Sequence, residues 1–204
     1  MTKIKICGIT NFRDAAKSLD CGADSLGFIF YEKSKRYISP SEAEKIIKEL
    51  PLFVTKVAVF VDCPFRQITK ITNKLFINAI QLHGSETPEF CARFSYPVIK
   101  ALKIKDSIDI LQVNSFTTQT ILFDTYSETD CGGTGKSFNW KVLEKLNTNK
   151  KIILSGGLNP GNIEKAITTV RPYAVDVSSG VEKSPGIKDH KKIKKFIEAV
   201  KNAD

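Results

Sequence analysis

A cysteine and an aspartate have the chemistry and the position to move protons. Cys7 ends the apolar segment Lys3–Cys7, and Asp124 ends the apolar segment Thr120–Asp124. A deprotonated thiol is a base and a protonated carboxyl is an acid, so the two could flank a substrate as an acid–base pair. Packing in the core for Cys7, and capping of a loop for Asp124, are the alternatives that position alone leaves open.

Two glycine-containing pairs follow apolar runs near the end of the chain. They are Gly156-Gly157 and Ser179-Gly180. Backbone N–H groups without a side chain approach a ligand closely, and a helix N-terminus adds positive potential. We therefore expect a phosphate site at these four residues, completed by a short helix over residues 180–186. The alternative is two turns that need glycine only for backbone geometry.

Eight short apolar segments alternate with amphipathic ones along the chain. The apolar segments lack strict alternation, which is typical of strands buried on both faces of a parallel sheet. The expected strands are Lys3–Cys7, Ser25–Phe30, Thr55–Val61, Ala79–Leu82, Val98–Leu102, Thr120–Asp124, Lys151–Leu154 and Ala174–Val177. The expected helices are Asn11–Asp20, Ser39–Leu50, Pro64–Leu75, Thr87–Phe94, Ser107–Asn114, Trp140–Leu146, Asn159–Val170 and His190–Lys201.

Local sequence signals predict where two of the helices begin. Ser39 followed by Pro40 and Glu42 predicts a capping box, and Asn159 followed by Pro160 predicts a second N-cap with proline in the first helical position.

Eight strand–helix units predict an α/β fold, a single (β/α)8 TIM barrel of near-minimal length over residues 1–204. The rival is an open doubly wound sheet, which usually has five or six strands. Barrel enzymes carry their chemistry at the carboxyl ends of the strands. That rule selects Cys7 and Asp124, and it adds Arg36, Gln81 and His83 as further pocket residues.

The amino-acid composition indicates which kinds of molecule the protein is expected to bind. The net charge of +9 comes from 31 basic residues, of which only five are arginine, against 22 acidic ones. Base readout favours arginine, and the lysines are scattered, so we expect no nucleic acid and a small anionic substrate instead. No apolar run approaches the roughly 18 residues of a membrane span, and no secretory signal is visible, so we expect no membrane and a cytoplasmic location.

The five cysteines are widely spaced and form no CxxC motif. We therefore expect free thiols and no metal site. The segment 130–137 ends in Gly-Lys-Ser like a P-loop, but Asp130 stands where the first glycine is required. A lid over the barrel mouth is the better interpretation of residues 125–137.

Blocks spread over nearly the whole chain resemble the phosphoribosylanthranilate isomerase family of tryptophan biosynthesis. Each block alone is modest, but together and in the family's order they are specific. They are Lys5–Thr10, Gly27–Tyr31, Ser34–Pro40, Val59–Val61, Gln81–Gly84, Gly132–Lys136 with Phe138 and Trp140, Leu154–Pro160, and Asp176–Glu182 with Pro185 and Gly186. The segment 85–114 matches only weakly.

The resemblance implies a (β/α)8 barrel and an Amadori rearrangement that needs no cofactor and no metal. The substrate is a small phosphosugar, N-(5'-phosphoribosyl)anthranilate, and the product is 1-(2-carboxyphenylamino)-1-deoxyribulose 5-phosphate. In the family pattern Cys7 is the general base and Asp124 the general acid, Arg36 pairs with the anthranilate carboxylate, and Gln81 and His83 line the pocket.

Two alternatives remain at the level of sequence. One is another phosphosugar barrel enzyme, similar to indole-glycerol-phosphate synthase or to an epimerase, and the other is a basic binding module without catalysis. Oligomeric state also stays open: a monomer is expected, with a dimer through loops as the alternative.

Overall fold

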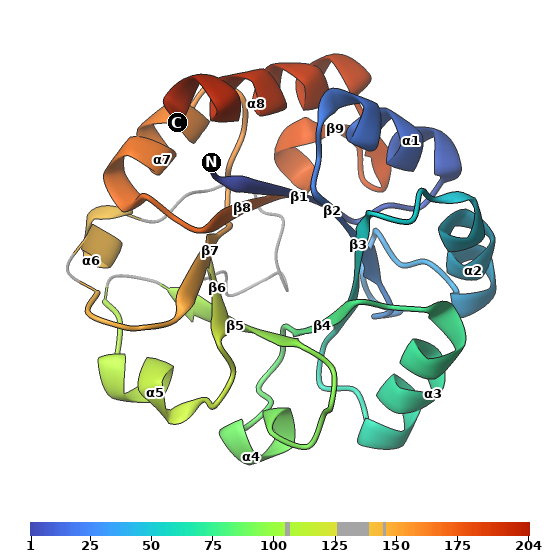
Figure 1. The fold of residues 1–204 in the computed structure, drawn as a ribbon, viewed down its shortest axis with the longest axis horizontal. Helices are drawn as coiled ribbons and strands as arrows, with labels where there is room; N and C mark the ends of the chain where they lie inside the picture. The colour runs from blue at the N-terminus through green and yellow to red at the C-terminus, as the bar shows by residue number, and fades with distance from the viewer. Residues whose placement is uncertain (105–106, 126–138, 145) are drawn as a thin grey trace.

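Eight parallel strands close into a barrel in the computed structural model (Figure 1). The structure describes residues 1–104, 107–125, 139–144 and 146–204. Each strand pairs with the next, and β8 pairs with β1, which confirms the (β/α)8 barrel and rules out the open sheet. The strands are β1 Lys3–Cys7, β2 Ser25–Ile29, β3 Thr55–Phe60, β4 Ala79–Leu82, β5 Val98–Ile104, β6 Thr120–Thr125, β7 Lys151–Leu154 and β8 Ala174–Val177.

Helices connect successive strands and form the outer ring of the molecule (Figure 1). They are α1 Phe12–Cys21, α2 Pro40–Glu49, α3 Phe65–Leu75, α4 Pro88–Cys91, α5 Ile110–Ser115, α6 Lys141–Glu144, α7 Ile163–Val170 and α8 His190–Ala203. Every expected helix has a counterpart here, but α4, α5 and α6 are shorter than their sequence patterns predict.

The predicted caps have mixed outcomes. The Ser39 hydroxyl and the Glu42 side chain form the expected capping box of α2. The predicted start of α7 at Asn159 is wrong, because the helix begins only at Ile163. The Asn159 side chain accepts from the N–H of Gly161, at 2.9 Å, and this local bond favours a turn over the first helical turn.

The expected short helix over residues 180–186 is also wrong. A single 3-10 turn, η1 Ser179–Val181, leads into a small hairpin of β9 Glu182–Ser184 and β10 Ile187–Lys188. Gly186 lies in this hairpin with φ of +82°, a left-handed conformation in which glycine avoids strain. The chain therefore turns back on itself after η1, and this places Glu182 and Lys188 beside each other.

Side-chain alternation along the strands creates two apolar layers. Inward-pointing residues such as Val57, Leu122 and Ile153 fill the barrel, while their outward neighbours pack beneath the helices. No helix in the described part of the chain is both long and apolar enough to cross a membrane. At the carboxyl end of the barrel the inward positions change from apolar to polar side chains, and this change creates the site.

Candidate active site

Strand alternation aims four polar side chains into one end of the barrel. Each of the four lies two residues after an inward-pointing residue of its own strand, so it points inward as well. They are Cys7, Gln81, Asp124 and Asp176. They line a cavity of about 400 Å³ at the carboxyl ends of the strands. This is the end of the barrel at which the sequence analysis expects the chemistry.

The cavity gathers eight of the nine expected site residues. Those that line it are Cys7, Arg36, Gln81, His83, Asp124, Gly156, Gly157 and Ser179. Gly180 lies just behind the lining, in η1. A Cβ atom added to Gly180 would overlap the backbone of Leu158, so the missing side chain lets η1 pack against the loop that follows β7. The four expected phosphate residues therefore come from two loops that touch.

A chain of hydrogen bonds orients Asp124. The Gln81 amide nitrogen lies 2.8 Å from His83 Nδ1, and His83 Nε2 lies 3.1 Å from Asp124 Oδ2. An amide nitrogen can only donate, so His83 Nδ1 accepts, and a neutral His83 then donates from Nε2 to the carboxylate. The backbone N–H of Thr125 donates to Asp124 Oδ1 at 2.8 Å, so both carboxylate oxygens are held.

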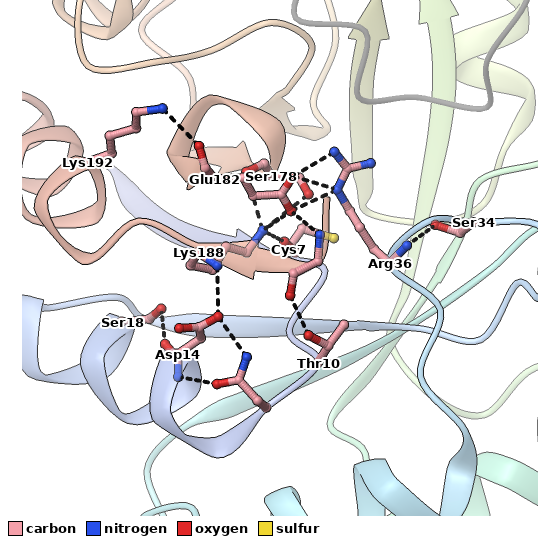
Figure 2. Close-up of polar contacts among 12 residues, drawn as sticks. Cys7, Thr10, Asp14, Ser18, Ser34, Arg36, Ser178, Glu182, Lys188 and Lys192 are labelled. Atoms are coloured by element: carbon pink, nitrogen blue, oxygen red, sulfur yellow. Dashed lines mark hydrogen bonds and ion pairs between the residues drawn. The ribbon is translucent and has the colours of Figure 1, made fainter. Parts of the chain in front are cut away.

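Arg36 is fixed by a carboxylate from the far end of the chain. Its Nε donates to Glu182 Oε1 at 2.9 Å and its Nη2 donates to Glu182 Oε2 at 2.8 Å. The same carboxylate also binds a lysine, since Lys188 Nζ donates to Glu182 Oε1 at 2.9 Å. Lys188 Nζ donates in addition to the backbone oxygen of Cys7. Figure 2 shows Lys188 between Cys7, Ser178 and Glu182.

The charges around Glu182 set its protonation. Burial acts to raise the pKa of this carboxyl, but hydrogen bonds and positive charge from Arg36 and Lys188 outweigh burial and lower the pKa below its ordinary value. Glu182 is therefore a carboxylate at neutral pH, and Arg36 is held in one orientation at the rim of the cavity.

Cys7 lies in a buried and charged environment. Burial raises the pKa of its thiol above the ordinary value, while the ammonium groups of Lys5 and Lys188 act in the opposite direction. Lys5 lies two residues back on the same strand and forms a buried ion pair with Asp176, at 2.9 Å from Nζ to Oδ1. In the ligand-free protein Cys7 is therefore a thiol at neutral pH.

Four charged residues of this site did not emerge from the sequence as site residues. Lys5 and Asp176 carried one signal, a charge inside a predicted strand with an apolar residue on either side. Glu182 and Lys188 gave no local signal, because the hairpin that brings them to Arg36 was not predicted, and Glu182 lay in the helix expected over residues 180–186. Within the described ranges, no group of three or more His, Cys, Asp or Glu side chains could hold a metal ion. The expected lid lies, apart from Thr125, outside the described residues.

Comparisons with known proteins agree on one family. Residues 4–199 match the family described as N-(5'phosphoribosyl)anthranilate (PRA) isomerase. The N-(5'-phosphoribosyl)anthranilate isomerase of Thermotoga neapolitana is 48% identical over 204 residues, which cover 98% of this chain and 99% of the relative. The crystal structure of phosphoribosyl anthranilate isomerase from Thermotoga maritima aligns with a TM-score of 0.93 at 46% identity, over 99% of this chain and 100% of that one.

A further solved structure contains a ligand. It is phosphoribosyl anthranilate isomerase in complex with reduced 1-(o-carboxyphenylamino)-1-deoxyribulose 5-phosphate, with a TM-score of 0.89 and 44% identity over 99% of this chain and 100% of that one. None of these matches favours a synthase, an epimerase or a binding module without catalysis. This chain belongs to the N-(5'-phosphoribosyl)anthranilate isomerase family, and it is an isomerase of tryptophan biosynthesis.

Proposed function

We propose that Cys7 and Asp124 carry out the rearrangement of N-(5'-phosphoribosyl)anthranilate in this cavity, as general base and general acid. The observation that carries this proposal is their position: a thiol on β1 and a carboxylate on β6 line one cavity. The relative solved with a reduced form of the product, a small phosphosugar, supports the same class of ligand for this chain.

The two anionic ends of the substrate fit two different parts of the cavity. We assign the phosphate to the loops that carry Gly156, Gly157, Ser179 and Gly180, because glycine-rich loops after the last two strands of a barrel commonly bind phosphate through backbone N–H groups. We assign the anthranilate carboxylate to Arg36. Glu182 occupies the Nε edge of its guanidinium, so the Nη1 edge is the one that a second carboxylate would meet.

Asp124 is assigned the first proton transfer. It protonates the ring oxygen of the ribose, the bond from that oxygen to C1' breaks, and the nitrogen lone pair forms the C1'–N double bond of an iminium ion. A general acid gives up a proton, so Asp124 enters this step in its protonated form. The bonds from His83 and Thr125 hold the carboxylate in place while the proton leaves.

Cys7 is assigned the second transfer. Its thiolate removes the C2' proton, the electrons of that C–H bond form a C1'–C2' double bond, and the nitrogen becomes neutral. The resulting enolamine tautomerises to the ketone. The positive iminium ion favours the thiolate at the moment when it is needed, because an adjacent opposite charge stabilises an ionised group.

We assign Gln81 the role of accepting a hydrogen bond from a substrate hydroxyl. Its Oε1 is buried and has no hydrogen-bond partner among the described residues, while its amide nitrogen is used by His83. A buried acceptor without a partner is costly, so a ribose hydroxyl that donates to it would gain affinity.

The whole-protein test is a fluorescence assay in which phosphoribosylanthranilate is generated in situ. We expect the substrate fluorescence to fall much faster with the protein than without it. Equal rates would contradict the proposed function.

Oligomeric state is a separate question. A monomer stays our prediction, although the Thermotoga maritima enzyme is described as dimeric. Sedimentation at several concentrations will measure it, and a concentration-independent dimer would contradict the prediction.

A further inference from the structure

We propose that Lys5 is the positioning residue for the base: its ammonium pairs with Asp176 beside Cys7, and it stabilises Cys7 as a thiolate when the thiolate is needed. The inference rests on the proposed role of Cys7 as general base. It adds a function for a buried ion pair that would otherwise be part of the core.

The strand geometry places the two side chains together. Lys5 and Cys7 are two residues apart on β1, so both point into the barrel. Gly27 of β2 lies opposite them, and a Cβ atom added there would lie 2.8 Å from Cys7 Sγ and 3.2 Å from Lys5 Cε. The sulfur and the end of the lysine side chain therefore share the space that the missing side chain of Gly27 leaves.

Asp176 is the second partner of the same ammonium. The Cα atoms of Lys5 and Asp176 are register partners of β1 and β8, and the Nζ–Oδ1 distance is 2.9 Å. The Lys5 side chain is only 3% exposed, whereas Asp176 lines the cavity together with Cys7. One buried cation thus lies between one carboxylate and one thiol at the floor of the cavity.

The charges agree with this arrangement. Burial acts to lower the pKa of Lys5, but Asp176 and Cys7 raise it above its ordinary value, so Lys5 stays cationic. For Cys7, burial raises the pKa, Lys5 lowers it and Asp176 raises it. The thiol and the carboxylate therefore compete for one ammonium. The charged or titratable groups that face Cys7, or line the cavity or its rim, are Lys5, Asp176, Lys188, Arg36, Glu182, His83, Asp124, Tyr31, Lys33 and Lys35.

The competition gives Lys5 a defined part in the reaction. Before the transfer, a Cys7 thiolate and Asp176 share the Lys5 ammonium. When the sulfur takes the C2' proton, its negative charge disappears and the ammonium interacts with Asp176 alone. Lys5 exchanges no proton and forms no bond with the substrate.

A buried ion pair elsewhere in the barrel provides the matched control. Lys100 Nζ lies 2.7 Å from Glu86 Oε2, and the two side chains are 2% and 3% exposed. Lys100 is on β5 between the inward-facing residues Ile99 and Ala101, so it points outward and does not line the cavity. Replacing either lysine removes a buried ion pair, but only Lys5 is next to the thiol.

The test measures how fast iodoacetamide alkylates Cys7 as a function of pH in the ligand-free protein. Mass spectrometry of the Cys7 peptide separates this thiol from the other cysteines. The variants are Lys5→Met, Asp176→Asn and Lys100→Met, with thermal unfolding as the check on folding. Alkylation reads the thiolate without turnover, so it is independent of whether Cys7 proves to be the catalytic base.

We expect opposite shifts from the two partners. Lys5→Met should move the alkylation midpoint to higher pH by about one unit or more, and slow the reaction about tenfold or more at a fixed pH below it. Asp176→Asn should move the midpoint to lower pH. Lys100→Met should leave it unchanged. Damage to the structure alone would not shift the alkylation midpoint of Cys7 in opposite directions in the two variants.

An unchanged midpoint in Lys5→Met, or shifts in the same direction in both variants, would overturn the inference. If Lys5→Met does not fold, Asp176→Asn decides alone: a lower midpoint supports the inference, and an equal or higher one refutes it. If the shifts occur but Cys7→Ala keeps full turnover, the proposed role of Cys7 fails while the link between Lys5 and the thiol stands.

Discussion

Cys7 and Asp124 are each only 5% exposed, yet both line the cavity. A substrate that reaches them has left most of its water behind, and interactions between charges are stronger in such a place than in solvent. Proton transfer at this site therefore depends on the few charged side chains that face each group.

The first residue-scale prediction concerns the pH dependence of catalysis. Burial raises the pKa of Cys7, so this proposed base is mostly protonated at neutral pH. We expect kcat/KM to rise with pH between about 7 and 9, because kcat/KM reports the ionisation of the free enzyme and only the thiolate is competent. Initial rates across buffers of constant ionic strength will measure it. A profile that is flat over this range would show that thiol ionisation does not limit the reaction.

The second concerns Arg36. Arg36→Met removes a charged fork, and we expect kcat/KM to fall by about tenfold or more, mainly through KM, because hydrogen bonds to charged groups are worth about 1.5–3 kcal/mol. Arg36→Lys should recover only part of this loss, since lysine keeps the charge without the fork. Unchanged kinetics in Arg36→Met would place the anthranilate carboxylate elsewhere.

The sequence predicted the proposed acid and base, but it did not predict the ion pairs that surround them. Cys7 and Asp124 could be found because each follows an apolar strand, a local pattern. The partner of Lys5 is 171 residues away and the partner of Arg36 is 146 residues away. Such pairs depend on how strands and hairpin meet in space, and local patterns do not report this.

At the scale of elements, the loop after β7 has a backbone conformation at Gly156 that favours glycine. Gly156 has φ of +85°, and a Cβ atom there would overlap Thr125 and lie 2.8 Å from Asp124 Oδ1. We expect Gly156→Ala to lower the free energy of unfolding by about 1 kcal/mol or more and to reduce kcat, because the loop would press on the acid. Urea unfolding and steady-state kinetics will measure the two effects. A variant with unchanged stability and kcat would mean that the loop adapts without cost.

The hairpin of β9 and β10 gives a prediction for acid stability. The pKa of Glu182 is lowered in the folded state, so its stabilising effect is complete above the ordinary pKa of about 4.3 and is lost as the pH falls through the folded value. We expect wild type to exceed Glu182→Gln in free energy of unfolding at pH 7, and the difference to shrink as the pH falls towards 3. Denaturant unfolding at several pH values will measure it. A difference that does not vary with pH would mean that Glu182 ionises alike in both states.

The elements themselves were predictable where local chemistry decides. The strands are correct to within two residues at each end, and the capping box at Ser39 is confirmed. Besides the shortened helices α4, α5 and α6, one error follows β7 and another follows β8. The Asn159 turn delays α7, and the hairpin that carries Glu182 replaces the expected short helix after β8.

At the scale of the whole molecule, closure of the barrel brings residues that are far apart in the sequence close together in space. The ends of the chain also meet, since the Thr2 N–H donates to Asp204 Oδ2 at 2.6 Å. The eight-unit count predicted this closure because each strand–helix pair is a local pattern repeated around a ring. The cavity could be located from the same count, but its charge pattern could not.

The central claim is that Cys7 and Asp124 move the two protons of the rearrangement. The most direct measurement is kcat in the fluorescence assay for wild type, Cys7→Ala and Asp124→Asn, with circular dichroism to check that each variant is folded. We predict a loss of roughly 10²-fold or more in kcat for each variant while the fold stays intact. A folded variant with near-wild-type kcat would contradict the claim for that residue.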